Sequence, residues 1–254
     1  MPDPATRPPL LSATALTKRF GSQQVLHGVD LTIASGQVLG LIGPNGSGKT
    51  TLIRLLTGLL APDQGKVQIG GIDLRLNPEG ARRSLGHAPD PGLLPPNLSG
   101  AQALAVVSAA RGMASVPADA WALAERLGLS RWLERPVSHY SLGTRQKLAV
   151  VQALLGLPPL LVLDEVLNGL DPIAAYELKQ HLGELAARGH AILLATHGLE
   201  AAVDLLHVAV VLIDGRIQRR FEVNELAQCR AAGPGAFESV VVAAIRAAGS
   251  VPPT

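Results

Sequence analysis

Gly43-Pro44-Asn45-Gly46-Ser47-Gly48-Lys49-Thr50 is the stretch of sequence that decides the fold. It matches the pattern G-x-x-x-x-G-K-[ST] at every fixed position. The glycines allow successive backbone N–H groups to point at phosphate oxygens, and the following helix adds its positive N-terminal end. Lys49 then supplies a charge for the β- and γ-phosphates, and the Thr50 hydroxyl supplies a ligand for Mg²⁺. The stretch therefore predicts a site for ATP with Mg²⁺.

The segments on either side of this loop support the same interpretation. Residues 38–42 form a short apolar run that predicts a buried strand, and residues 49–60 have the apolar spacing of a helix. An ordinary Gly-rich turn between a strand and a helix is the alternative. The complete match, together with a strand before it and a helix after it, favours the phosphate-binding loop.

A second group of acidic residues follows an apolar run at residues 160–163. Asp164 and Glu165 would lie at the carboxyl end of a parallel strand, the edge at which such sheets bind ligands. A carboxylate at Asp164 suits Mg²⁺, and one at Glu165 suits a general base that polarises the attacking water. The alternative is a pair of solvated acids, which the phosphate-binding loop makes less favoured.

Strand and helix patterns alternate along the chain and predict an α/β P-loop fold. We expect a mostly parallel sheet, an N-terminal antiparallel β region and an inserted helical subdomain. The predicted strands are residues 10–20, 25–33, 38–42, 160–163, 191–195, 208–213 and 216–220, and residues 66–74 are expected to form two strands joined by a Gly-Gly turn. The predicted helices are residues 49–60, 99–111, 118–127, 142–155, 173–187 and 199–205.

This pattern divides the chain into three predicted parts. Residues 1–10 form a flexible tail, residues 11–221 form the ATPase domain, and residues 222–254 form a partly helical extension. The helical subdomain is expected at about residues 78–140, where Ala, Arg and Pro are frequent.

Composition narrows the possible functions. The net charge is only +2, and the sequence has no block of Lys or Arg residues, so nucleic-acid binding is not expected. Cys229 is the single cysteine, which fits a reducing cytoplasm and excludes a disulfide within the chain. The stretch most similar to a membrane span, residues 148–163, is interrupted by Gln152 and by Gly156-Leu157-Pro158-Pro159. We therefore expect a helix and a strand there, and membrane contact only through a partner.

Four further segments make the chain resemble an ATP-binding cassette ATPase. Tyr140-Ser141-Leu142-Gly143-Thr144-Arg145-Gln146 stands where that family has its signature loop. Asn168-Gly169-Leu170-Asp171-Pro172 resembles the D-loop, and Ala195-Thr196-His197 resembles the segment with the switch histidine. Phe20 stands where the family stacks an aromatic ring on adenine. The resemblance covers about residues 11–221, and the order of the motifs is more specific than any single one.

The resemblance implies roles for individual residues. It assigns catalysis to Lys49, Glu165 and His197, with the histidine sensing the γ-phosphate. It assigns nucleotide contacts to the loop residues 43–50 and to the set Phe20, Val25, Thr51, Ser141 and Gly143. Several have simpler alternatives. Ser141 is also a favoured helix cap, Asp171 a turn residue, Phe20 a core residue, and His197 a packed or surface histidine.

This sequence departs from the family pattern at three places, of which one, Val166 in place of the usual Pro after Glu165, is taken as neutral. Its signature is Ser-Leu-Gly-Thr-Arg, in which Leu142 and Thr144 replace Gly and Gln; such forms resemble exporter-type members. Asp90 stands where the family usually has Gln. Asp90 is one methylene shorter and charged, and we expect it to face Mg²⁺ through water.

The resemblance also implies partners and a location. Two ATPase subunits, identical or different, pair head to tail, and their closure drives a transmembrane permease subunit that selects the substrate. The chain would then be cytoplasmic and peripheral on the cell membrane. One alternative is a soluble cassette ATPase acting on chromosomes or ribosomes. The first type has long coiled coils and the second usually has two cassettes, whereas this sequence has neither. The other alternative is a regulatory nucleotide-binding module in which Asp90 weakens hydrolysis.

Overall fold

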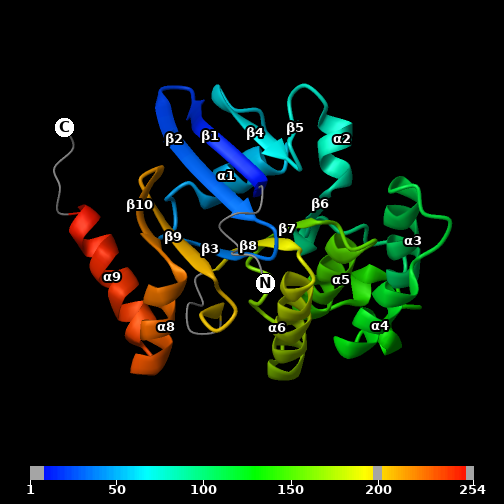
Figure 1. The fold of residues 1–254 in the computed structure, drawn as a ribbon. Helices are drawn as coiled ribbons and strands as arrows, with labels where there is room; N and C mark the ends of the chain where they lie inside the picture. Colours follow the sequence, from blue (N-terminus) through cyan, green and yellow to red (C-terminus); the bar gives the residue numbers. More distant parts are fainter. Residues whose placement is uncertain (1–8, 197–201, 250–254) are drawn as a thin grey trace.

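A computed structural model describes residues 9–196 and 202–249, and it contains two β-sheets with helices between and beside them (Figure 1). The smaller sheet has the order β2-β1-β4-β5, and the larger has the order β10-β9-β3-β8-β7-β6. Helix α1 (Lys49–Leu56) lies between the two sheets and buries apolar residues against them. This arrangement confirms the predicted fold class.

The smaller sheet is antiparallel and forms the N-terminal β region. Its strands are β1 (Pro9–Phe20), β2 (Gln23–Ala34), β4 (Gln64–Ile69) and β5 (Ile72–Asp73). Leu11, Ala13 and Leu16 of β1 are buried, and a bulge at Ala15 keeps them on the inner face. Ala15 has φ 50°, and its N–H donates to Asp30 Oδ1 at 2.8 Å. The bulge explains why Leu16 interrupts strict alternation.

The larger sheet is parallel except at β10. Its strands are β3 (Val38–Ile42), β6 (Leu85–His87), β7 (Leu160–Asp164), β8 (Ala191–Ala195), β9 (Val208–Ile213) and β10 (Arg216–Phe221). Every residue of β3, β8 and β9 is buried, as expected for parallel strands covered on both faces. Because β3 and β7 both run parallel to β8, their carboxyl ends reach the same edge of the sheet.

The helices beside the larger sheet follow the predicted pattern closely. They are α3 (Gly100–Ala110), α4 (Ala118–Arg126), α5 (Leu142–Leu154) and α6 (Pro172–Ala187). Short 3₁₀ turns lie at η2 (Pro91–Leu93), η3 (Ser130–Trp132) and η4 (Val137–His139). Helix α1 ends at Leu56, earlier than the predicted residue 60, because Gly58 adopts φ 71° and terminates the helix.

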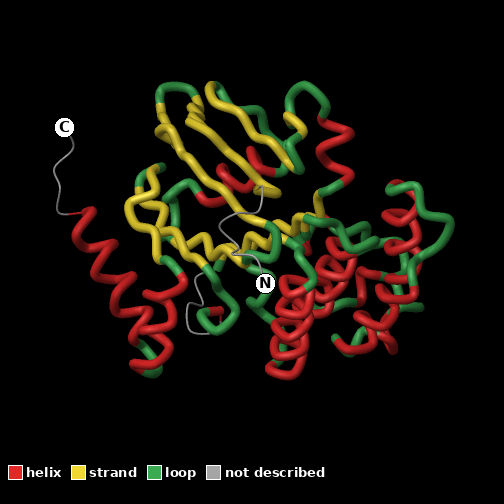
Figure 2. Tube along the Cα trace, in the orientation of Figure 1, coloured by secondary structure: helices red, strands yellow, loops and turns green. Residues whose placement is uncertain are grey.

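Two elements near the start of the inserted part were not predicted. Helix α2 (Pro78–Arg83) is a short helix capped by Asn77, whose Oδ1 accepts from Gly80 N at 2.9 Å. Strand β6 pairs in parallel with β7 at the edge of the larger sheet. Figure 2, in the orientation of Figure 1, shows that α3, α4 and α5 lie on the side of the molecule where β6 forms the sheet edge. A three-residue strand of Leu, Gly and His is too short to show an apolar period, so sequence patterns do not reveal it.

An ion-pair cluster joins α4 to α6. Arg126 Nε lies 2.9 Å from Glu177 Oε2, and Arg126 Nη1 lies 3.4 Å from Glu184 Oε2. These carboxylates raise the pKa of Arg126. Burial, followed by the charge of Arg126, lowers the pKa of the neighbouring His181. The cluster therefore attaches the helical part to the helix that follows Glu165.

The C-terminal extension contains two helices, α8 (Val223–Ala232) and α9 (Ala236–Gly249). Phe221 and Phe237 pack edge to face with ring centroids 5.6 Å apart, which fixes α9 against β10. Residues 1–8 of the predicted tail, residues 199–201 of the helix predicted at 199–205, and residues 250–254 lie outside the described residues. Within the described ranges, every helix is too short or too polar to span a bilayer.

We predict that Gly86→Ala destabilises the protein by about 1–3 kcal/mol, because the new methyl group would overpack this position. A Cβ at Gly86 would lie 2.6 Å from Pro158 Cγ and 2.7 Å from Leu161 Cδ2, and it would clash with the Ala153 carbonyl oxygen. Thermal unfolding should show a decrease of about 2–4 °C per kcal/mol.

Gly183→Ala is the matched control. A Cβ at Gly183 would lie 3.7 Å from Leu205 Cδ1, an ordinary contact, and the residue is within helix α6. This change should raise stability by up to about 1 kcal/mol, since Ala favours helix over Gly. Equal melting temperatures for the two variants would contradict the packing described for β6.

Candidate nucleotide-binding and catalytic site

The Gly-rich loop connects the end of β3 to the start of α1. Gly46 has φ 81° and Gly48 has φ 103°, backbone conformations that residues other than Gly rarely adopt. A Cβ at Gly43 would clash with the carbonyl oxygen of Leu212. At Gly46 a Cβ would meet no atom within 4 Å, so the loop is open on that side. The glycines thus give a loop that is packed against β9 yet leaves room for a ligand.

The Lys49 side chain is buried with 8% exposure at the first position of α1. Its ammonium donates to Gly43 O at 2.6 Å and to Pro44 O at 3.1 Å. Burial lowers the pKa of Lys49, while the charges of Glu165 and Asp164 oppose this by favouring the ammonium form. The loop carbonyls and the two acids together hold a cation at the base of the loop.

The acidic residues reach the same place from β7. Asp164 ends this strand, and Glu165 N donates to Ala195 O on β8 at 2.9 Å. Glu165 has φ 52°, a left-handed conformation that is uncommon for residues other than Gly, and it turns the chain sharply away from the sheet. Such backbone strain is frequent at functional sites.

One cavity joins the loop to these acids. Its volume is about 360 Å³, and it is lined by Val25, Asn45, Gly46, Gly48, Lys49, Thr50, Thr51, Asp164 and Glu165. All nine were singled out by sequence. The cavity is open to solvent and combines a buried ammonium, backbone groups of a helix N-terminus and two carboxylates, a set that fits a polyphosphate.

The same residues fit Mg²⁺. The exposed Thr50 and the Asp164 carboxylate both line the cavity, and they are oxygen donors, which Mg²⁺ prefers. No cluster of three or more His, Cys, Asp or Glu side chains forms a metal site among the described residues. Mg²⁺ needs none, because it usually keeps several waters and binds one or two protein groups plus substrate phosphates.

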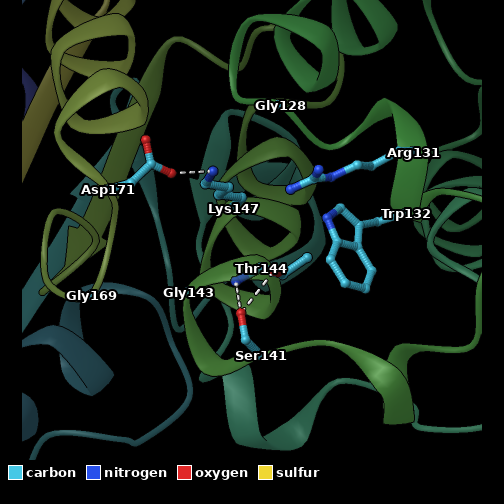
Figure 3. Close-up of a pocket in the computed structure, with 9 residues that line it drawn as sticks. All are labelled: Gly128, Arg131, Trp132, Ser141, Gly143, Thr144, Lys147, Gly169 and Asp171. Carbon is cyan, nitrogen blue, oxygen red and sulfur yellow. Dashed lines mark hydrogen bonds and ion pairs between the residues drawn. The ribbon is translucent and has the colours of Figure 1, made fainter.

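A second cavity, of about 300 Å³, lies beside the N-terminal half of α5 (Figure 3). Its lining residues are Gly128, Arg131, Trp132, Ser141, Gly143, Thr144, Lys147, Gly169 and Asp171. Ser141 caps α5, since its Oγ accepts from Thr144 N at 3.2 Å and contacts Thr144 Oγ1 at 2.9 Å. Ser141 and Gly143 therefore do not line the Lys49 cavity of their own chain.

The segment after Glu165 packs directly on α5. A Cβ at Gly143 would clash with the Gly169 carbonyl oxygen, so this close approach requires Gly. Lys147 Nζ lies 2.6 Å from Asp171 Oδ2, and Asp171 Oδ1 caps α6 by accepting from Ala174 N at 3.0 Å. The bond from Lys147, followed by the bond from Ala174, lowers the pKa of Asp171.

Phe20 and Asp90 lie away from the Lys49 cavity. Phe20 is 49% exposed at the end of β1, with Lys18 Nζ 5.7 Å from its ring centroid, and it is not among the residues lining the Lys49 cavity. Asp90 does not line that cavity either; it is exposed and caps the η2 turn through Oδ1, which accepts from Gly92 N at 2.8 Å. His197 lies outside the described residues.

Two contacts were not anticipated from sequence. Asn168 Nδ2 donates to Glu165 Oε2 at 2.6 Å, and Lys147 pairs with Asp171 as described above. Asn168 belongs to the segment that resembles the D-loop, and Lys147 directly follows the signature segment. The sequence gives no signal for their partners, because these contacts depend on how the turn and the helices pack.

The fold and the loop together define an ATP-binding cassette. The sequence model of the family described as ABC transporter matches residues 26–168. A solved structure of the ATP-binding subunit of an ABC transporter aligns with a TM-score of 0.83 and 30% identity, covering 92% of this chain and 99% of that one.

Curated relatives agree with this assignment. An uncharacterized ABC transporter ATP-binding protein, YdbJ, of Bacillus subtilis is 38% identical over 212 residues, which is 83% of this chain and 68% of that protein. The Nod factor export ATP-binding protein I of Ralstonia nicotianae is 36% identical over 220 residues, covering 86% and 68%. The chain belongs to the ABC transporter family, as an ATP-binding subunit.

We predict that Lys49→Ala weakens ATP binding and abolishes hydrolysis, because it removes a buried ammonium that pairs with phosphate. The loss of binding should be on the order of 2–5 kcal/mol. Titration with a fluorescent ATP analogue and a phosphate-release assay would measure both effects. Lys66→Ala, at an exposed lysine on β4, should leave both unchanged. Normal turnover in the Lys49 variant would contradict the site.

Proposed function

We propose that this chain hydrolyses ATP in a head-to-tail pair of subunits and thereby drives a membrane transporter. The observation that carries this proposal is the division of the site within one chain. The Lys49 cavity provides the phosphate loop and the acids, whereas Ser141 and Gly143 line a separate cavity at the end of α5. Each half becomes complete when it faces the other half on a second subunit.

The chemical step follows from the residues of the Lys49 cavity. The loop N–H groups and the Lys49 ammonium hold the β- and γ-phosphates and stabilise the charge that spreads over the transferring group. Glu165 accepts a proton from water as the water oxygen bonds to the γ-phosphorus and the bond to the β–γ bridging oxygen breaks, which yields ADP and phosphate. Mg²⁺, when bound through Thr50 and Asp164, neutralises phosphate charge.

The remaining predicted residues would complete the site. The N-terminal end of α5, with Ser141 and Gly143, would contact the γ-phosphate held by the other subunit. Phe20 would stack on adenine, and its 49% exposure makes part of the ring accessible for such a contact. His197, which follows β8 by two residues in the sequence, would sense the γ-phosphate.

A groove beside the helical part is our candidate for the permease contact. Its volume is about 930 Å³, and it is lined by residues of α2, the C-terminal end of α3 and the connection from α5 to β7. Arg82, Arg83 and Arg111 contribute to it. The nearby stretch 82–98 also exposes Leu93 by 80%. The subunit would then lie on the cytoplasmic face of the membrane.

The direction of transport is proposed as export. The relative from Ralstonia nicotianae is named for Nod factor export. The signature Ser-Leu-Gly-Thr-Arg at residues 141–145 resembles exporter-type members. We infer export as the direction, with the substrate selected by the permease.

We predict that Glu165→Gln produces a dimer in ATP that returns to monomer in ADP. The amide keeps the shape of the side chain but does not accept the proton of water, so hydrolysis should slow by about 10²–10⁴-fold. ATP then persists between the two subunits. Size exclusion with light scattering would give the mass in each nucleotide.

Ser141→Arg in the Glu165→Gln background is the informative control. The larger side chain would occupy the space at the end of α5 and should abolish the ATP dimer. A monomer in both nucleotides, with ATP shown to be bound, would count against the composite site. Pairing that is unchanged by Ser141→Arg would show that the signature segment is misassigned.

We also predict that Asp90→Ala slows turnover or uncouples it from the permease while leaving ATP affinity nearly intact, because Asp90 lies away from the phosphate loop. Asp90→Asn keeps a favoured capping side chain but removes the negative charge, so it separates the effect of the cap from the effect of the charge. Steady-state rates and ATP titrations would test this. A large loss of ATP affinity with normal saturated turnover would show that Asp90 is misplaced.

A further inference from the structure

The turn that follows the catalytic strand brings Asn168 back onto Glu165. Asn168 N donates to Glu165 O at 3.0 Å, which closes a tight turn, and Asn168 Nδ2 donates to Glu165 Oε2 at 2.6 Å. The two residues are thus joined through both backbone and side chain. A hydrogen bond from an amide to a carboxylate is among the stronger kinds.

The position of Asn168 is determined by its neighbours. Val166 is fully buried and Leu167 is 8% exposed, so the centre of the turn is anchored in the core. The next residue, Gly169, packs its carbonyl against Gly143 of α5. The Asn168 backbone is therefore fixed on both sides, and its side chain has a defined direction toward Glu165.

We propose that Asn168 is a positioning residue for Glu165, whose amide holds the carboxylate in the orientation from which it accepts the proton of the attacking water. This inference rests on the hydrolytic function proposed above. In this role Asn168 acts only through its hydrogen bonds to Glu165.

The physical reason is the geometry of proton transfer. A carboxylate on a two-methylene side chain rotates freely unless a second group fixes its plane, and a base works efficiently only within hydrogen-bond reach of the proton. Misplacement by about 1 Å costs up to about 100-fold in rate. In a closed dimer the exposed edge at Asn168 would lose water, which would strengthen this bond.

The experiment compares Asn168→Ala, Asn168→Gln and Asn168→Asp in steady-state hydrolysis of ATP. Asn168→Ala should lower kcat about 10- to 100-fold and change KM for ATP less than about twofold. Asn168→Gln keeps the donating amide and should recover part of the rate. Asn168→Asp has the same shape, but its charged form accepts instead of donating, so it should be at least as slow as Asn168→Ala.

A second measurement separates positioning from a structural role. With Glu165→Gln already present, the carboxylate that Asn168 orients is gone, so adding Asn168→Ala should change the residual single-turnover rate less than about threefold. Asn224→Ala, at an exposed asparagine on α8, is the matched control and should behave as the parent chain in rate and thermal unfolding.

The outcomes are distinct. Parental kcat in Asn168→Ala or in Asn168→Asp would overturn the positioning role, as would a rise in KM without a fall in kcat. Full additivity with Glu165→Gln would also overturn it, because it would indicate a structural effect. A parent chain that fails to hydrolyse ATP, or a Glu165→Gln variant at the parental rate, would instead overturn the proposed function and this inference with it.

Discussion

The buried ammonium of Lys49 is the group on which the rest of the site depends. A cation in this position requires oxygen partners, and it has two loop carbonyls at 2.6 and 3.1 Å and the charges of Asp164 and Glu165 nearby. These partners come from two strands, β3 and β7, with β8 between them. A parallel arrangement brings both strand ends to one edge of the sheet. The charge balance of the site therefore depends on the sheet topology.

Close backbone approach is the second feature of this structure. Gly43 packs against the Leu212 carbonyl, and Gly143 packs against the Gly169 carbonyl. The first contact sets the phosphate loop on the sheet, and the second sets α5 against the segment that follows Glu165. A side chain at either glycine would push apart two elements that the proposed mechanism needs together.

The segment 165–171 connects the two cavities of a single subunit. It begins at Glu165 in the Lys49 cavity and ends at Asp171, which pairs with Lys147 beside the second cavity. In the head-to-tail pair that we propose, one subunit's second cavity would face the nucleotide of the other. This short turn, anchored by the buried Val166 and Leu167, would then link each subunit's own base to the surface that contacts its partner's nucleotide, and Asn168 lies at the centre of that link.

The sequence by itself determined the phosphate loop, the acidic strand end and the order of most strands and helices, because these depend on local patterns of glycine, charge and apolar spacing. It also indicated the family. Tertiary structure alone decided that β6 joins the sheet, that Asp90 caps a turn away from the Lys49 cavity, and that Asn168 and Lys147 have the partners they do. A short strand carries no period, and a side-chain contact depends on the packing of elements that are distant in sequence or on the exact path of a turn, which local patterns do not encode.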